Sequence, residues 1–150
     1  GLPEIEEKLI RLAADEKYRG RICLLCGYDQ VLANRIYAAG DFLLLPSKYE
    51  PCGLTDFSAQ LFGNLPIVHH IGGLVKVIDG ETGLAYREHN SAALMGAILK
   101  ALALFRESPG KILEMRLAAV RHIQAHYTWD LVVERYLKPY DKAMKIAADL

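Results

Sequence analysis

The chain has 150 residues, of which 52% are hydrophobic, and its 18 basic residues balance 18 acidic ones. This size and apolar content suit one globular domain with a substantial core. Because the charges form neither a block nor a basic stripe, a nucleic-acid surface and an anionic-membrane surface are both disfavoured. The apolar runs are shorter than the roughly 20 residues of a membrane-spanning helix, and no secretory signal opens the chain, so we expect a soluble, cytoplasmic protein.

Helical and extended patterns alternate along the first half of the chain. The spacing of apolar residues predicts helices over 3–17, 30–39 and 53–63, with strands over 21–26 and 41–45. A third short strand is expected to begin at Pro66, and residues 82–86 are expected to form a turn and a fourth strand. Alternation of this kind is typical of an α/β fold.

The second half of the chain is predicted to be helical, over 91–106, 109–126 and 130–146. Residues that favour helix ends mark the boundaries: Asp29, Ser91 and Ser108 as N-caps, Pro109 as a first helical residue, and Gly40 and Gly63 just past helix ends. Two helices carry apolar stripes that are expected to pack in the core. The stripe over 91–106 consists of Leu94, Ile98, Ala101, Leu102 and Phe105, and the stripe over 109–126 of Ile112, Met115, Ala119 and Ile123.

The chain opens directly on a helical pattern, because Gly1–Glu4 lead into Ile5, Leu9 and Leu12 without a preceding strand. An α/β domain normally begins with a strand. We therefore expect the sequence to be a piece of a longer protein, with at least one strand missing.

Three cysteines are present, an odd number that fits reduced thiols better than a disulfide framework. Cys23 and Cys26 have the spacing of a redox pair. On the predicted strand over 21–26, however, residues three apart point to opposite faces. A disulfide or metal site is therefore disfavoured, and buried packing is expected for these side chains.

The segment from Asp41 to Thr55 combines a strand, a loop and a helix start. The apolar run 41–45 has the pattern of a strand buried on both faces of a parallel sheet. Cys52, Gly53 and Leu54 then fall at a helix N-terminus, whose free N–H groups form an anion seat. Glu50 beside this seat could accept hydroxyls of a sugar. Such a combination suits a sugar nucleotide, whose diphosphate the helix would receive.

On these residues the chain resembles the C-terminal, Rossmann-like domain of bacterial glycogen synthases and plant starch synthases, which are retaining glucosyltransferases of the GT-B fold. The resemblance covers nearly the whole chain. It rests on Gly1–Glu4, Gly27–Asp29, Arg35–Ala38, Asp41–Leu45, Pro46–Thr55, Gly72–Leu74, Thr82–Gly83 and Thr128–Trp129. Glu50–Leu54 followed by Gly72–Leu74 is the specific signal. The resemblance implies that residues 1–150 are a donor-binding domain fragment with a parallel sheet flanked by helices, cytoplasmic or, in a plant, plastidic.

The resemblance also implies roles for single residues. Tyr28 would lie against the adenine of the donor, and Glu50, the predicted catalytic residue, would contact the donor glucose. Backbone N–H groups of Cys52, Gly53, Leu54 and Thr55, helped by the Thr55 hydroxyl, would hold the phosphates. Gly72, Gly73 and Leu74 would face the donor sugar and phosphates.

Each of these roles has a structural alternative. Tyr28 could be a half-buried loop tyrosine, and Glu50 a surface carboxylate or a partner of the helix dipole. The glycine pair could be an ordinary turn between strands. Cys52 could be a reactive thiolate at a helix N-terminus, but no histidine lies nearby in sequence to serve as its base.

The sequence departs from the family pattern at several positions. Ile71 and Lys76 replace a usual threonine and aspartate around the glycine pair, and Lys48 replaces a usual arginine. Ser58 stands where many related transferases carry a second glutamate, which glycogen synthases also usually lack. The last departure favours the glycogen synthase branch.

No metal or other cofactor is expected. Adjacent side chains on a strand point apart, which argues against His69 and His70 as joint ligands. His122 and His126 lie one turn apart on a helix but lack the glutamate of a metalloprotease motif. The family that the chain resembles needs no metal.

The resemblance implies transfer of glucose from ADP-glucose to the nonreducing end of an α-1,4-glucan with retention. The acceptor glucan would bind through a missing N-terminal domain, so the fragment alone is expected to be inactive. Two alternatives stay open: a retaining transferase with another nucleotide-sugar donor, and a non-catalytic sugar-nucleotide-binding module, which Ile71 and Lys76 favour. A dinucleotide-binding dehydrogenase is disfavoured because no Gly-x-Gly-x-x-Gly follows a strand.

Overall fold

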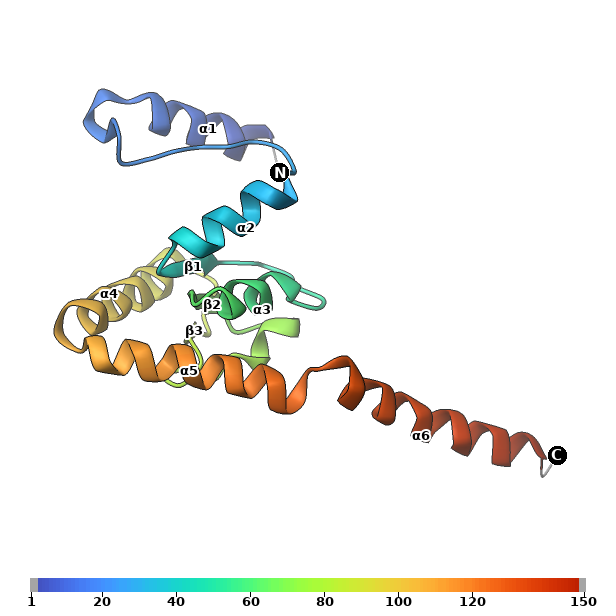
Figure 1. Cartoon of the computed structure of the whole chain (residues 1–150). Helices are drawn as coiled ribbons and strands as arrows, with labels where there is room; N and C mark the ends of the chain where they lie inside the picture. The colour runs from blue at the N-terminus through green and yellow to red at the C-terminus, as the bar shows by residue number, and fades with distance from the viewer. Residues whose placement is uncertain (1–2, 149–150) are drawn as a thin grey trace. The chain divides into compact units, whose positions relative to one another are not determined.

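The computed structural model describes residues 3–148 (Figure 1). The chain divides into two compact units, Gly1–Leu32 and Ala33–Leu150. The first unit contains helix α1, Pro3–Ala14, and a short 3-10 helix, η1, Glu16–Tyr18. The helix predicted over 3–17 therefore ends three residues early. Its continuation is replaced by a turn in which the Asp15 side chain accepts the Lys17 N–H at 2.9 Å.

The strand predicted over 21–26 is not formed. Residues 22–26 have no regular structure and take no part in the three-stranded sheet, whose members all come from the second unit. A strand is stable only when a neighbour pairs with its N–H and C=O groups, and no described strand does so here. Cys23 and Cys26 are consequently exposed, so the expectation of buried cysteines is wrong. A hydrogen bond to Glu6 raises the pKa of the Cys26 thiol.

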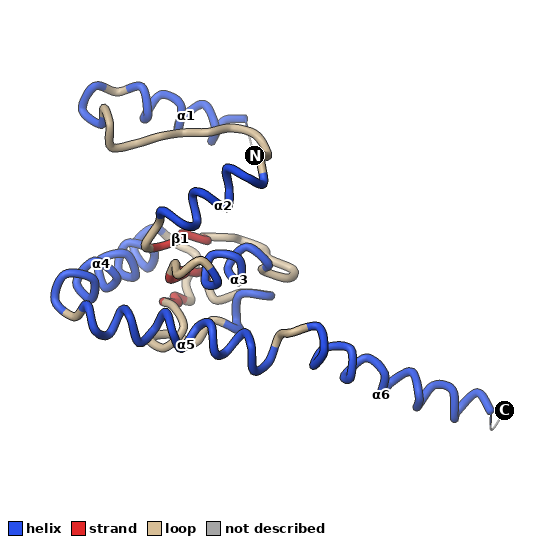
Figure 2. Tube along the Cα trace, in the orientation of Figure 1, coloured by secondary structure: helices blue, strands red, loops and turns tan. Residues whose placement is uncertain are grey.

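The second unit is built on a parallel sheet in the order β1–β2–β3, whose strands are labelled in Figure 1 and red in Figure 2. The strands are β1, Phe42–Leu45, β2, Leu65–His69, and β3, Leu84–Tyr86. Every residue of β2 is buried, whereas Leu44 of β1 is 47% exposed. The expectation that 41–45 is buried on both faces is therefore wrong. Strand β1 pairs with β2 alone in the described sheet, so it forms an edge.

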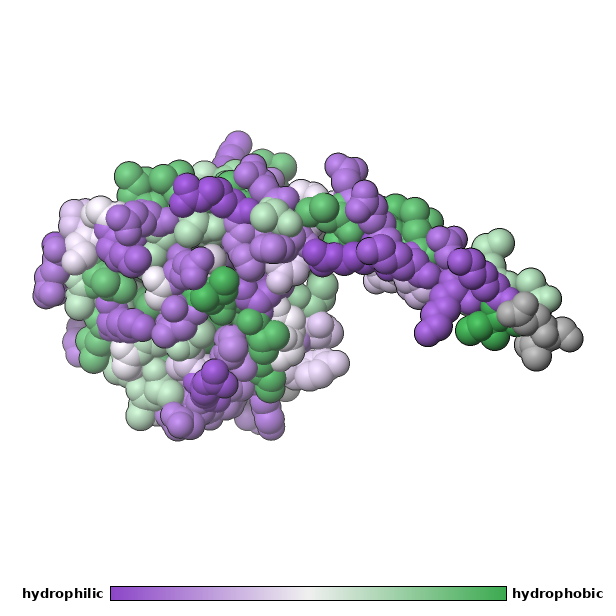
Figure 3. All heavy atoms as spheres, turned by 90° about the horizontal axis from the view of Figure 1, so that it is seen from below, coloured by the Kyte–Doolittle hydropathy of each residue, from purple (hydrophilic) through white to green (hydrophobic). Residues whose placement is uncertain are grey.

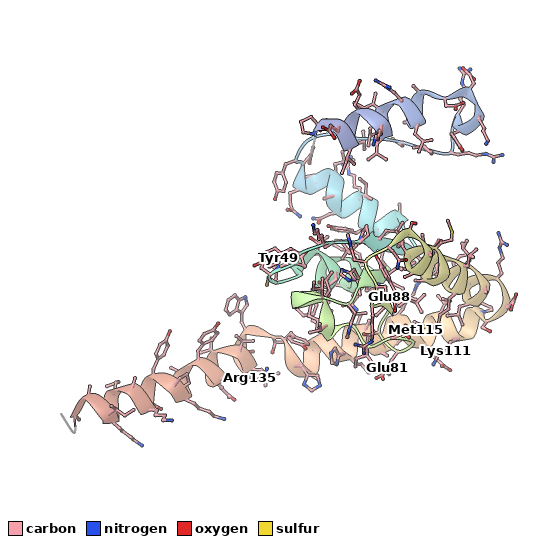
Figure 4. The ribbon with its side chains drawn as sticks, turned by 180° about the vertical axis from the view of Figure 1, so that it is seen from behind. Tyr49, Glu81, Glu88, Lys111, Met115 and Arg135 are labelled. Carbon is pink, nitrogen blue, oxygen red and sulfur yellow. The ribbon has the colours of Figure 1, made fainter. Side chains whose placement is uncertain are left out.

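Alternate residues of β2 face two different hydrophobic clusters. Leu65 and Ile67 pack with Ala101 of α4, Ser91–Glu107, and with Met115 of α5, Pro109–His126. Met115 is labelled in Figure 4. Val68 packs on the other side with Leu74 and Val77. The α5 stripe predicted to be core is confirmed, since its four members are buried: Ile112, Met115, Ala119 and Ile123. The α4 stripe is only partly in the core, because Ala101 is buried while Leu102 and Phe105 are 40% and 42% exposed.

The remaining helices are α2, Gln30–Ala39, α3, Leu54–Leu61, and α6, Trp129–Ala148. Asp29 caps α2 as predicted, since its side chain accepts the Leu32 N–H at 2.9 Å. Helix α4 is capped by Asn90, not by Ser91, because the Asn90 side chain reaches the Ala93 N–H at 2.8 Å. Helix α6 has no buried residue and carries apolar side chains among charged ones (Figure 3). No helix within 3–148 combines the length and apolarity that a membrane crossing demands.

Candidate functional site

The loop after β1 leads into α3 as predicted, and Gly53 is the residue that makes the turn. Gly53 is the N-cap of α3 and has φ 71° and ψ 56°, in the left-handed region that favours glycine. A β carbon at this position would also lie 2.7 Å from the Lys76 Nζ. Cys52, Gly53 and Leu54 therefore fall at a helix N-terminus, which confirms the local prediction. Cys52 is exposed and is not in a disulfide.

The Glu50 carboxylate turns back onto its own loop. Oε1 accepts the backbone N–H of Gly53 at 3.1 Å, and Oε2 accepts the Ser47 hydroxyl at 3.3 Å. A carboxylate that accepts an N–H at a helix start also interacts favourably with the helix dipole. The structure thus shows the helix-dipole role that the sequence left open as an alternative. Contact of Glu50 with a sugar stays a prediction.

The glycine pair packs directly against the Glu50 loop. The Gly73 N–H donates to the Glu50 carbonyl at 2.8 Å. A β carbon at Gly72 would lie 2.0 Å from the Glu50 carbonyl oxygen, and one at Gly73 would lie 2.1 Å from that of Cys52. The sequence analysis expected the glycine pair to face the donor; the structure shows the backbone of the Glu50 loop against it, and contact of the pair with a donor stays a prediction.

The loop expected around Gly72 and Gly73 forms a 3-10 helix, η2, Gly72–Lys76. Leu74 within it is fully buried, and its side chain packs in the core cluster with Val68 and Val77. The Leu74 N–H donates to the Ile71 carbonyl at 3.0 Å, and its carbonyl accepts the Val77 N–H at 3.1 Å. A ligand therefore reaches neither the side chain nor the backbone of Leu74 in this conformation, and contact of Leu74 with a donor stays a prediction.

Lys76, noted above as a departure from the family pattern, ends η2 and forms a buried cluster with Asp56 of α3. The Lys76 side chain is 10% exposed and that of Asp56 is 0% exposed, with Nζ and Oδ1 3.1 Å apart. Nζ also lies 4.1 Å from the centre of the Phe57 ring. The sequence analysis missed Asp56. The available signal was a carboxylate within the apolar pattern of the predicted helix over 53–63, followed later in the chain by Lys76, a cation to which the sequence assigned no partner.

Burial raises the pKa of Asp56 above its ordinary value of 3.8, and the Lys76 ammonium offsets part of this effect. The two carboxylate oxygens have no hydrogen bond of acceptable geometry within the described residues, although the ammonium is at ion-pair distance. The loss of water around the Asp56 carboxylate therefore raises its pKa more than the attraction of the Lys76 ammonium lowers it.

The raised pKa of Asp56 predicts a pH dependence of stability. The folded state holds the Asp56 proton more tightly than the unfolded state, so this contribution is fully present below about 3.8 and declines as pH rises through the raised pKa. In urea unfolding at a series of pH values, the stability of the unmodified chain minus that of Asp56→Asn should fall across this window. A difference that increases with pH would contradict the assignment, because it would mean that attraction to Lys76 dominates.

His69 holds the loop after β1 to the end of β3. Its Nδ1 lies 2.7 Å from the Ser47 carbonyl and its Nε2 lies 3.0 Å from the Arg87 carbonyl. His70 instead contacts the Val75 carbonyl through Nε2, at 3.2 Å. Both rings therefore make contacts to the backbone. Within residues 3–148, no group of three or more His, Cys, Asp or Glu side chains could hold a metal ion.

Tyr28 belongs to the first unit, where its ring is 89% exposed and its hydroxyl donates to Gln30 Oε1 at 2.8 Å. The alternative of a half-buried tyrosine is therefore wrong. The strand predicted over 21–26, whose carboxyl end would have led directly into Tyr28, is absent, so Tyr28 does not follow a strand. An exposed ring is available for stacking on a base, and that role stays a prediction.

Comparison with known proteins places the chain in a family. The family model described as "Glycosyl transferases group 1" matches residues 2–103, more than half of the chain. The chain belongs to this family. Among its curated relatives, glycogen synthase of Xanthomonas oryzae pv. oryzae (strain PXO99A) is 38% identical over 151 residues, which are 100% of this chain and 28% of the relative. Glycogen synthase of Pseudomonas aeruginosa is 36% identical over 149 residues, 99% of this chain and 28% of the relative.

Solved structures agree on the fold of this group 1 glycosyltransferase chain. The catalytic domain of starch synthase IV from Arabidopsis thaliana, bound to ADP and acarbose, has a TM-score of 0.81 at 23% identity, covering 96% of this chain and 31% of that one. A glycosyltransferase from Rickettsia africae has a TM-score of 0.78 at 20% identity, and the match covers 96% of this chain and 38% of that one. The fold is that of GT-B C-terminal domains, as predicted. The chain spans less than a third of the curated relatives' length.

Proposed function

We propose that the chain is the donor-binding part of a glycogen or starch synthase, which transfers glucose from ADP-glucose to the nonreducing end of an α-1,4-glucan with retention. One observation carries this proposal: the similarity to glycogen synthases runs along 98–100% of the chain and includes both loops that meet at α3. The acceptor glucan would bind to parts of the protein outside these 150 residues.

The start of α3 supplies the anion-binding groups in this proposal. The Gly53 N–H donates to Glu50, so in this proposal the amides of Cys52, Leu54 and Thr55 hold the phosphate oxygens. Leu54 and Thr55 are both exposed, and the Thr55 hydroxyl adds a further donor. Charge develops on the leaving diphosphate during transfer, and donors aimed at that charge lower the barrier.

A second candidate is a sugar-nucleotide-binding module without catalysis. The specific observation in its favour is that the Glu50 carboxylate is committed to Gly53 and Ser47 within its own loop. In that case the α3 terminus would still bind a diphosphate, while no sugar would be activated. Binding without transfer in the longer protein would distinguish this candidate from a synthase.

The proposal is tested by glucan elongation. Glycogen, labelled ADP-glucose and the longer protein that carries this chain should give incorporation that amylolytic digestion removes, whereas the isolated 150-residue chain should give none. The difference is expected because the acceptor must be held beside the donor for transfer to occur. Elongation by the isolated chain at a rate like that of the longer protein would contradict the division of roles. No incorporation by the longer protein would favour the module.

A further inference from the structure

The Lys76 ammonium is surrounded by protein acceptors, two that it hydrogen-bonds and one at ion-pair distance. Its Nζ donates to the carbonyl oxygens of Cys52 at 2.7 Å and Gly53 at 2.5 Å, and it lies 3.1 Å from the Asp56 carboxylate. An ammonium group has three N–H donors, and three acceptors surround this one. Lys76 is therefore unsuited to hold a ligand directly, and its contacts join segments of the protein.

Those contacts tie η2 to the loop that carries Glu50. Lys76 is the last residue of η2, and its two carbonyl partners immediately precede α3. A second tie runs from the Gly73 N–H to the Glu50 carbonyl at 2.8 Å. The backbone from Glu50 to Gly53 is thus attached to η2 near both of its ends. We call this arrangement of Glu50–Gly53 and Gly72–Lys76 the loop pair.

Burial makes the Lys76 contacts specific. A buried ammonium that loses one partner is left with an uncompensated charge, which is strongly unfavourable. The face of Phe57, 4.1 Å from Nζ, adds a cation–π contact on one side of the ammonium. If the loop moved away, the ammonium would remain partly buried and would lose the two carbonyl oxygens that it contacts. The arrangement therefore favours a single conformation of the loop pair.

We infer that Lys76 is a positioning residue of the donor site, which fixes the backbone of Glu50–Gly53 and thereby the Glu50 carboxylate relative to the first amides of α3. The identity of the ligand rests on the function proposed above. The positioning of Glu50–Gly53 by Lys76 rests only on the contacts of the loop pair. The residue that departs from the family pattern is thus assigned a role in building the site.

The variant Lys76→Met tests this inference, because methionine keeps most of the side-chain length and lacks the ammonium. Lys100→Met is the matched control, since Lys100 Nζ also lies 3.1 Å from a carboxylate, that of Asp79, but both side chains are about half exposed. Backbone amide hydrogen exchange is measured by NMR, and ADP-glucose binding by calorimetry, on the 150-residue chain.

In Lys76→Met, exchange at the Gly53 and Gly73 amides should accelerate about tenfold or more, because both donate to Glu50. Amides of β2 should stay within about twofold. The dissociation constant for ADP-glucose should rise about tenfold. Lys100→Met should change neither quantity, because exposed ion pairs contribute little.

The outcomes separate the inference from the proposed function. Unchanged Gly53 and Gly73 exchange in Lys76→Met would overturn the inference, even if the chain binds ADP-glucose. Faster exchange in a chain that binds no nucleotide would support the positioning of the loop pair and count against the donor assignment. If Lys76→Met does not fold, reductive methylation of the unmodified chain decides: Lys76 should react about tenfold slower than Lys100 because of its burial and bonding. Equal rates would overturn the inference.

Discussion

Replacement of Gly73 by alanine should destabilise the second unit by about 3 kcal/mol, the upper end of what overpacking costs. The added β carbon would lie 2.1 Å from the Cys52 carbonyl oxygen and 2.2 Å from its carbonyl carbon. Both are backbone atoms of the loop pair, so no side-chain rotation relieves the clash. Separation of the two loops would also break the Gly73 N–H to Glu50 bond. Urea unfolding followed by circular dichroism measures the loss.

Gly96→Ala is the control for this prediction. Gly96 lies inside α4, and nothing lies within 4 Å of the position that its β carbon would take. Alanine in a helix interior is more favourable than glycine by roughly 0.5–1 kcal/mol, so this variant should be more stable than the unmodified chain. Equal stability of the two variants would mean that the loop pair is not packed backbone against backbone.

Replacement of Glu50 by glutamine should weaken donor binding by about tenfold and lower stability by about 1 kcal/mol. A carboxylate accepts both the Gly53 N–H and the Ser47 hydroxyl, whereas an amide has only one acceptor oxygen for these two donors. Glutamine also removes the negative charge at the start of α3. Calorimetric titration with ADP-glucose and urea unfolding give the two quantities.

Glu81→Gln is the control, because Glu81 is exposed in the turn before β3 and is shown with its side chain in Figure 4. It should bind ADP-glucose and unfold as the unmodified chain does. If Glu50→Gln matches it in both measurements, the loop conformation does not depend on the Glu50 charge.

Local patterns were sufficient to predict most of the second unit. Apolar periodicity located α3, α4 and α5, and Gly53 was correctly placed at the start of α3 because a loop and a helical stripe meet there. The segment over 21–26 shows the limit of such reasoning. Its apolar residues favour a strand, yet a strand also requires a partner in space, and the local sequence carries no information about whether one is present.

The candidate site was only partly predictable for a similar reason. The motif identified Glu50 and the glycine pair, but not that Glu50 turns inward to Gly53 and Ser47. Lys76 was recognised as a departure, while its partner Asp56 lies 20 residues earlier and meets it only through the packing of η2 against α3. Pairings of this kind depend on tertiary structure, which periodicity does not report.

The measurement that tests the central claim most directly is calorimetric titration of the 150-residue chain with ADP, ADP-glucose, UDP and UDP-glucose. A Tyr28→Ala, Glu50→Gln double variant serves as the reference. We expect binding selective for the adenine nucleotides, near ~1 mM or about 4 kcal/mol, that the double variant loses. Absence of binding to any nucleotide, or equal binding of adenine and uracil nucleotides that the double variant retains, would contradict the assignment of an ADP-glucose donor site to this chain.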